Sequence, residues 1–282
     1  MSVPSSCPVV CAALMPHAPI LIPAVAGERA ARTRSTVAAM REAARRAVAA
    51  GADCVVVISP HAPRHSEAFG IRTGERLRGA LGAFGAPEEV VDLPNDTALA
   101  AQIARQAAGR GVPTRPIDDM ALDHGTIVPL WFFAEAGWRG PVVAAGLSLT
   151  DHFKVVEFGR AVADAAASTG RRLAFIASGD MSHRLTLGAP CGYDARGAEF
   201  DRWLIDTLRR GGFRELLDFR QDLEEAAAQD ALDSVLVALG ATGFSTNGAE
   251  VLNYDGPFGV GYGVAILSSE AAPSAEEPCL RH

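Results

Sequence analysis

The strongest constraint on the fold of this chain is a four-residue sequence that occurs twice, each time directly after a predicted strand. The apolar runs at residues 9–15 (VVCAALM) and 54–58 (CVVVI) are followed by Pro-His-Ala-Pro at 16–19 and 60–63. Continuous apolar runs of this length are typical of strands covered on both faces of a sheet. The residues between them, 28–50, carry apolar positions at helical spacing. Strand, helix and strand form a βαβ unit, which predicts parallel strands.

The same alternation of strands and helices continues along the chain. We expect helices at 99–109, 126–136, 153–168, 199–210 and 222–239, and strands at 141–149, 172–178, 250–254 and 261–267. No linker is long enough to divide the chain. The pattern predicts a single α/β domain over residues 1–269, with a central, mostly parallel β-sheet and helices on both faces. The remaining residues, 270–282, are expected to be a disordered tail.

Composition narrows the classes of function. The chain has 282 residues, of which 49% are hydrophobic and 21% charged, as in an ordinary globular protein. Its net charge of −7 and the lack of a basic stripe argue against nucleic-acid binding. No apolar run approaches the roughly 20 residues needed to cross a bilayer, and no basic segment opens a signal peptide. The 5 cysteines show no C-x-x-C spacing, which favours a reducing, cytoplasmic location.

The repeated Pro-His-Ala-Pro sequence predicts a metal site. His17 and His61 follow strands of one βαβ unit, 44 positions apart. If the two strands pair directly, their axes lie about 4.8 Å apart, and both imidazoles can reach one ion at about 2.1 Å. Open α/β sheets bind ligands beyond the carboxyl ends of their strands. The simpler alternative is that each histidine caps its own loop, but the repetition favours a shared role as metal ligands.

Two further histidines are candidates for the same edge of the sheet. His183 follows the strand at 172–178, within the sequence SGDMSH. His124 follows Asp123, which has the features of a helix N-cap, so His124 could occupy the first turn of a helix with no further role.

A carboxylate would complete a site typical of non-haem iron enzymes. Two histidines and one carboxylate on one face of Fe(II), with open positions opposite, characterise iron-dependent oxygenases. The candidates near the C-terminal strands are Glu250 and Asp255. Periodicity does not choose between them. An exposed strand position is the simpler role for Glu250, and a turn-forming role the simpler one for Asp255.

Taken in order, these sequences resemble the class III extradiol dioxygenases, the family of the protocatechuate 4,5-dioxygenase catalytic subunit. The matching segments are residues 15–19, 59–63, 123–130 (DHGTIVPL), 178–183 and 250–267. The stretch 192–240 and the ending YDGPFGVGYG at 254–263 are more similar to the Memo-like branch of the same superfamily, many of whose members have no assigned substrate.

The resemblance implies roles for individual residues. His17 and His61 match the iron-binding histidines, and Glu250 best matches the carboxylate ligand because an aromatic residue, Tyr254, follows four positions later. His183 matches the acid/base histidine, and His124 a histidine that contacts substrate. The implied activity is extradiol ring opening of a catechol or 2-aminophenol with Fe(II) and O2. Related dioxygenases often have a partner chain or self-associate, so a homodimer is one of two expectations for this chain.

Two alternatives keep the same site but change its chemistry. A zinc ion held by two histidines and a carboxylate could activate water for hydrolysis. A Memo-like protein could bind a metal without cleaving a ring. Arg64, Arg72 and Arg184 could meet a substrate carboxylate, although solvent-exposed roles are simpler for each.

Overall fold

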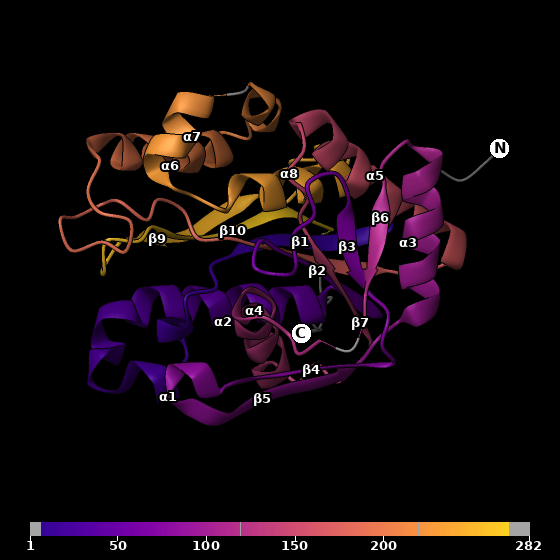
Figure 1. The fold of residues 1–282 in the computed structure, drawn as a ribbon, viewed down its shortest axis with the longest axis horizontal. Coiled ribbons are helices and arrows are strands. Elements are labelled where there is room, and N and C mark those ends of the chain that lie inside the picture. Colours follow the sequence, from indigo (N-terminus) through magenta and orange to yellow (C-terminus); the bar gives the residue numbers. More distant parts are fainter. Residues whose placement is uncertain (1–6, 119, 219, 271–282) are drawn as a thin grey trace, which may run out of the picture.

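An eight-stranded sheet forms the centre of the protein in the computed structural model, which describes residues 7–118, 120–218 and 220–270. Its strands are parallel across β7, β2, β8 and β1, and antiparallel neighbours close it at both sides (Figure 1). The expected α/β class with a mostly parallel sheet is therefore confirmed. In spatial order the strands are β6 (Thr114–Ile117), β3 (Phe69–Arg72), β7 (Val142–Gly146), β2 (Cys54–Ser59), β8 (Leu173–Ser178), β1 (Val9–Met15), β10 (Tyr262–Ser269) and β9 (Glu250–Asp255).

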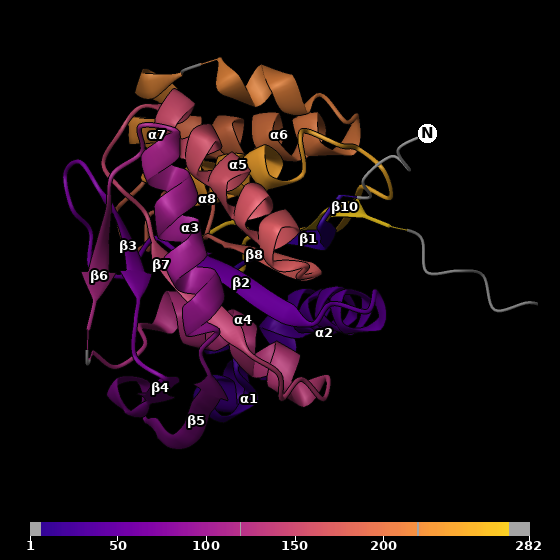
Figure 2. The ribbon, with the colours of Figure 1, turned by 90° about the vertical axis from the view of Figure 1, so that its right-hand side faces the viewer.

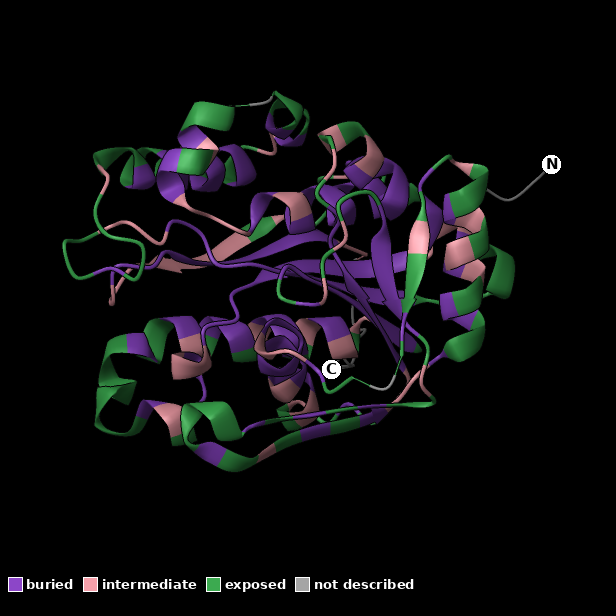
Figure 3. Ribbon diagram, in the orientation of Figure 1, coloured by how far each residue is buried: buried purple, intermediate pink, exposed green. Residues whose placement is uncertain are grey.

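Helices cover both faces of this sheet, as expected (Figures 1 and 2). On one face lie α2 (Arg34–Ala49) and α4 (His124–Glu135), and on the other α3 (Thr97–Gly109), α5 (His152–Thr169), α6 (Ala195–Arg209) and α8 (Leu232–Ala241). Successive residues of β1 alternate between the two cores: Leu14 packs into one, Ala13 and Met15 into the other. Burial on both faces explains why the strands read as continuous apolar runs (Figure 3).

A separate hairpin extends the layer on the α4 side. Strands β4 (Arg76–Leu81) and β5 (Ala86–Pro94) pair antiparallel and are joined by a short 3-10 turn, η3 (Gly82–Phe84). The hairpin packs closely on α4, since a Cβ at Gly79 would lie 2.7 Å from side-chain atoms of Leu122 and Ile127. The sequence analysis did not predict this hairpin or the short strands β3 and β6.

The two histidine-bearing strands do not pair directly, contrary to the arrangement considered from the sequence. Strand β8 lies between β1 and β2 and is parallel to both. All three strands end at the same edge of the sheet, so the loops that follow them still converge there. The site is therefore built on three neighbouring strands instead of two.

The helix expected at 222–239 is interrupted. Helix α7 (Gln221–Ala227) ends where Ala228 adopts a left-handed conformation (φ 49°), and α8 begins at Leu232. Tertiary hydrogen bonds replace the helical ones here, because the carbonyl of Ala227 accepts from the His183 amide and that of Ala228 contacts the His183 ring. The break turns residues 228–231 into a loop that faces the strand ends.

The C-terminal end of the described chain is held against the sheet. Glu270 is tied to the sheet by its amide, which donates to the carbonyl of Val10. Glu270 is the first residue of the disordered tail expected at 270–282, and residues 271–282 of that tail lie outside the described residues. Among the described helices, none combines the length and apolar character that a membrane crossing requires.

Candidate metal centre

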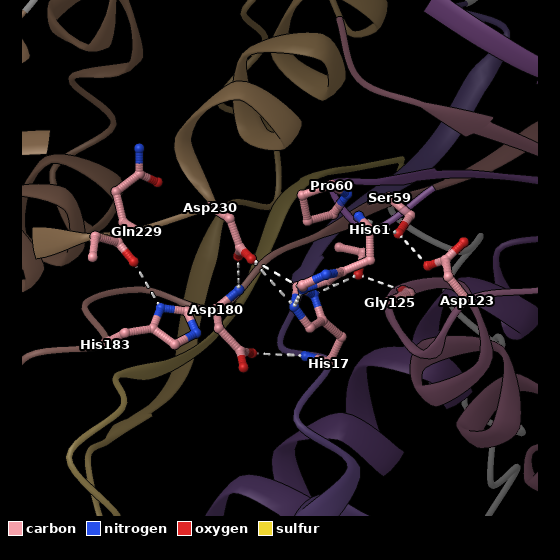
Figure 4. Close-up of polar contacts among 12 residues, drawn as sticks. His17, Ser59, Pro60, His61, Asp123, Gly125, Asp180, His183, Gln229 and Asp230 are labelled. Carbon is pink, nitrogen blue, oxygen red and sulfur yellow. Dashed lines mark hydrogen bonds and ion pairs between the residues drawn. The ribbon is translucent and has the colours of Figure 1, made fainter. Parts of the chain in front are cut away.

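His17 and His61 face each other beyond the carboxyl ends of β1 and β2 (Figure 4). Their Nε2 atoms are 3.0 Å apart, and the rings meet edge to face with centroids 4.7 Å apart. His17 is almost fully buried, whereas the side chain of His61 is 38% exposed. The two repeated Pro-His-Ala-Pro loops thus present their imidazoles at one point, with access to solvent on the His61 side.

His124 joins this pair from the first turn of α4. Its ring centroid lies 4.1 Å from that of His61 and 5.5 Å from that of His17. One ring nitrogen from each of the three histidines can be chosen so that all lie within 4.8 Å of one another, a grouping that could hold a metal ion. Asp123 does cap the helix, because its side chain accepts a hydrogen bond from the Thr126 amide.

Asp230 brings a carboxylate to the same point. Its Oδ2 atom lies 3.5 Å from Nε2 of His17 and 3.3 Å from Nε2 of His61. Donor atoms that each bind one ion at about 2.1 Å are separated by about 3.0 Å in octahedral and about 3.4 Å in tetrahedral geometry. The separations among these three atoms, 3.0 to 3.5 Å, fit a shared divalent cation in either geometry.

Hydrogen bonding behind His17 selects the tautomer that a metal ligand needs. The hydroxyl of Ser178, the last residue of β8, donates to the carbonyl of Gly125 at 2.5 Å. Its oxygen lies 3.0 Å from Nδ1 of His17 and, having given away its proton, must accept one from that nitrogen. In the neutral ring, Nε2 therefore carries the lone pair and points toward His61 and Asp230.

A second set of bonds holds the His61 and His124 loops together. Asp123 accepts from the Ser59 hydroxyl at 2.6 Å, and the Ser59 oxygen accepts from the His61 amide at 3.1 Å. Burial would raise the pKa of Asp123, but these hydrogen bonds from Ser59 and Thr126, with the charge of Arg72, lower it. The carboxylate thus stays ionised while it fixes both loops.

Arg72 supports this carboxylate from within the protein. Its side chain is 3% exposed, and its guanidinium lies 3.5 Å from Asp123 and donates to the carbonyls of Met120 and Ala121. These contacts commit Arg72 to the protein and remove it from the candidates for binding a substrate carboxylate.

The electrostatics of the centre favour replacing a proton by a cation. Burial alone would lower the pKa of His17, but the carboxylates of Asp180 and Asp230 outweigh it and raise the pKa to about 9. Burial would likewise raise the pKa of Asp230, yet His17 and His61 hold it far below its usual range. Binding of a metal ion at neutral pH would therefore release a proton from this cluster.

His124 has the opposite character. Burial, together with the neighbouring His61 and His17, lowers its pKa to about 4. At neutral pH its ring is therefore uncharged and can accept a hydrogen bond or ligate a cation without first losing a proton.

His183 lies on the other side of Asp180 and Asp230 from His17 (Figure 4). Its Nδ1 is 2.8 Å from the carbonyl of Ala228, which can only accept, so Nδ1 carries the proton. In the neutral ring, Nε2 is left with a lone pair. The histidine is thus oriented to take up a proton at that atom, although it is not within the group of three imidazoles.

The structure does not bring Glu250 to the histidines. Glu250 opens the edge strand β9, two strands from β1, with its side chain 53% exposed and its carboxylate 2.5 Å from Nη1 of Arg46 in α2. Asp255 lies at the other end of β9, where it accepts from the Gly256 amide and the Ser35 hydroxyl. Both carboxylates take the simpler roles considered for them, an exposed strand position and a turn.

The carboxylate at the centre, Asp230, was missed because the sequence predicts one helix through it. A signal was present: in the expected helix, Asp230 falls on the same face as Leu223 and Ala227, where a buried carboxylate calls for a partner. Asp180, whose Oδ1 accepts from the His17 amide at 2.8 Å, was noticed only as part of SGDMSH.

Comparison with known protein families shows which family this chain resembles. The family model of the catalytic LigB subunit of aromatic ring-opening dioxygenase matches residues 11–265 of the sequence. Protein CA_C1420 of Clostridium acetobutylicum is 28% identical over 265 residues, which cover 91% of this chain and 57% of that protein. The chain thus spans a little over half the length of that relative.

Solved structures support the fold. An uncharacterized protein of Escherichia coli K12, JW3007, superposes with a TM-score of 0.62 and 16% sequence identity, covering 91% of this chain and 98% of that one. At this level of identity the likeness extends to the fold alone.

Proposed function

Because the chain belongs to the family of catalytic LigB subunits of aromatic ring-opening dioxygenases, we propose that it opens the ring of a catechol or a 2-aminophenol with Fe(II) and O2. The observation that carries this proposal is the meeting of two imidazole nitrogens and one carboxylate oxygen within 3.0 to 3.5 Å of one another. This donor set is the one that iron-dependent oxygenases use, and it leaves positions open for substrate and oxygen.

The proposed ligands are His17, His61 and Asp230. Asp230 replaces Glu250 as the carboxylate, since Glu250 is engaged by Arg46 at the edge of the sheet. The hydrogen bonds from Nδ1 of His17 to the Ser178 oxygen and from the His61 amide to the Ser59 oxygen would keep the ligands in place as the ion binds. When bound, Fe(II) would supply Lewis acidity toward the two substrate heteroatoms and electrons toward O2.

The two remaining histidines have proposed roles in handling substrate protons. His183, with its Nδ1 proton held by the Ala228 carbonyl, would take a proton from a substrate hydroxyl at Nε2 and return it during ring opening. His124, uncharged at neutral pH, would accept a hydrogen bond from substrate beside His61. The role of His183 uses the ring nitrogen that its contact with Ala228 leaves available.

The test is an oxygen-uptake screen after anaerobic loading with Fe(II). Catechols and 2-aminophenols with different ring substituents should include at least one that consumes O2 in equal proportion to substrate and yields a coloured ring-opened product. Loading with Zn(II) should give none. Absence of uptake with every compound of both classes, from protein that has taken up one equivalent of Fe(II), would overturn the proposal.

One observation favours a second candidate function, zinc-dependent hydrolysis. The group formed by His17, His61 and His124 offers three imidazole nitrogens, the set found in some catalytic zinc sites, where a fourth position activates water for hydrolysis. In that case Zn(II), and not Fe(II), would restore activity, and the reaction would proceed without O2.

A further inference from the structure

Phe84 is an exposed aromatic side chain beside the candidate metal centre for which the proposed chemistry has no use. Its ring centroid lies 5.3 Å from that of His124, and the two ring planes make an angle of 61°. The side chain is nevertheless 42% exposed. The other large apolar residues of its hairpin that face α4, such as Leu77, Leu81 and Leu93, are buried. Phe84 therefore contributes little to the core.

The backbone holds Phe84 firmly at the tip of the hairpin. Residues Gly82–Phe84 form a 3-10 turn that ends at Gly85, whose positive φ of 82° lets its amide donate to the carbonyl of Gly82. Leu81 and Ala86 anchor the two sides of the turn in the core. The position of the ring thus follows from the turn and does not depend on burial of the ring itself.

The hairpin is also coupled to the helix that carries His124. The amide of Leu122 donates to the carbonyl of Arg78 at 2.8 Å, just before the first turn of α4. At Gly79 a Cβ atom would lie 2.9 Å from the carbonyl oxygen of Leu122, so only glycine permits this approach. Phe84 and His124 are therefore presented by two elements whose relative position is fixed.

We propose that Phe84 forms the wall of the binding site for the aromatic ring of the substrate. The inference rests on the proposed function. A catechol held through both oxygens would extend its ring away from the proposed ligands, toward the solvent side where His61 is partly exposed and His124 meets Phe84. A half-exposed phenyl ring gains both burial and an aromatic contact when such a ring lies against it.

The test compares two ligands that both chelate the metal, only one of which contains an aromatic ring. Protein loaded anaerobically with Fe(II) is titrated with 4-nitrocatechol, followed by its visible absorption, and with oxalate, which chelates the metal but has no ring. In Phe84→Ala the Kd for 4-nitrocatechol should rise about 3- to 10-fold, while that for oxalate stays unchanged. Phe84→Tyr should bind 4-nitrocatechol as the wild type does.

Val90→Ala is the matched control, because Val90 lies in the same hairpin and is equally exposed at 42%. Val90→Ala should change neither the Kd for 4-nitrocatechol nor the Kd for oxalate. Equal binding of 4-nitrocatechol by the wild type and Phe84→Ala would overturn the inference and leave the proposed function standing. A parallel loss of oxalate binding would also overturn it, since Phe84 would then act on the metal site. Failure of the wild type to bind 4-nitrocatechol at all would overturn both.

Discussion

At the scale of single residues, the two histidines of the repeated sequence meet as their positions suggested, but their carboxylate partner does not come from the C-terminal strands. His17 and His61 could be located from sequence because each follows an apolar strand directly. Asp230 reaches them only through a loop between two helices, across about 170 residues of chain from His61. No local pattern could join residues so far apart.

The first prediction tests whether Asp230 or Glu250 is the carboxylate that binds the metal. Asp230→Asn should weaken Fe(II) or Zn(II) binding by at least about 10-fold, because a neutral amide replaces the only carboxylate oxygen within 3.5 Å of both Nε2 atoms among the described residues. Glu250→Gln, which removes an exposed ion pair with Arg46, should leave metal affinity unchanged. Metal titration monitored by calorimetry measures both. The reverse pattern would restore Glu250 as the ligand.

The second prediction concerns the proposed acid/base residue. His183→Ala should retain a full equivalent of Fe(II), since the ring is not in the imidazole group, and should lower kcat about 10²- to 10⁴-fold. His65→Ala, a histidine after the second repeat with no place in the proposed mechanism, serves as the control. The measurements are metal content and steady-state oxygen uptake. A fully active His183→Ala enzyme would rule out the acid/base role of His183.

At the scale of elements, strands and long helices could be predicted more reliably than interruptions. The buried strands and the helix α5 follow from apolar runs and helical periodicity, which depend on neighbours in sequence. The break between α7 and α8 depends on hydrogen bonds from the His183 loop, which sequence periodicity does not contain. The hairpin β4–β5 was missed for a similar reason, since its strands pack on α4.

The third prediction tests a buried acid that joins three elements. Asp201 in α6 accepts from the amide of Ser182 and the hydroxyl of Tyr254 in β9, and it is fully buried. Burial raises its pKa from 3.8 to about 6. The fold therefore favours the protonated acid: its stabilising contribution is complete below about pH 4 and is lost as the pH rises through 6.

Asp201→Asn cannot ionise and should lose this dependence. Between pH 4 and pH 7, the free energy of unfolding of the wild type should fall by about 3 kcal/mol relative to that of the variant, measured by urea denaturation at each pH. Asp206 lies on the same helix but is exposed and paired with Arg209. The variant Asp206→Asn should therefore show the same fall in the free energy of unfolding between pH 4 and pH 7 as the wild type. Parallel curves for Asp201→Asn and the wild type would show that Asp201 is ionised throughout.

At the scale of the whole molecule, sheet order decides which loops meet. Strands β2, β8 and β1 lie side by side and parallel, so their carboxyl ends bring together His61, Ser178 and His17. Helix α4 adds His124 from one face of the sheet, and the α7–α8 loop adds Asp230 from the other. The centre therefore forms only when the complete fold is in place.

The most direct test of this account is to locate the ion itself. Crystals grown anaerobically with Fe(II) should show, at the iron absorption edge, a single anomalous peak about 2.1 Å from Nε2 of His17 and of His61 and from a carboxylate oxygen of Asp230. A peak beside Glu250, or none between the two histidines, would contradict it.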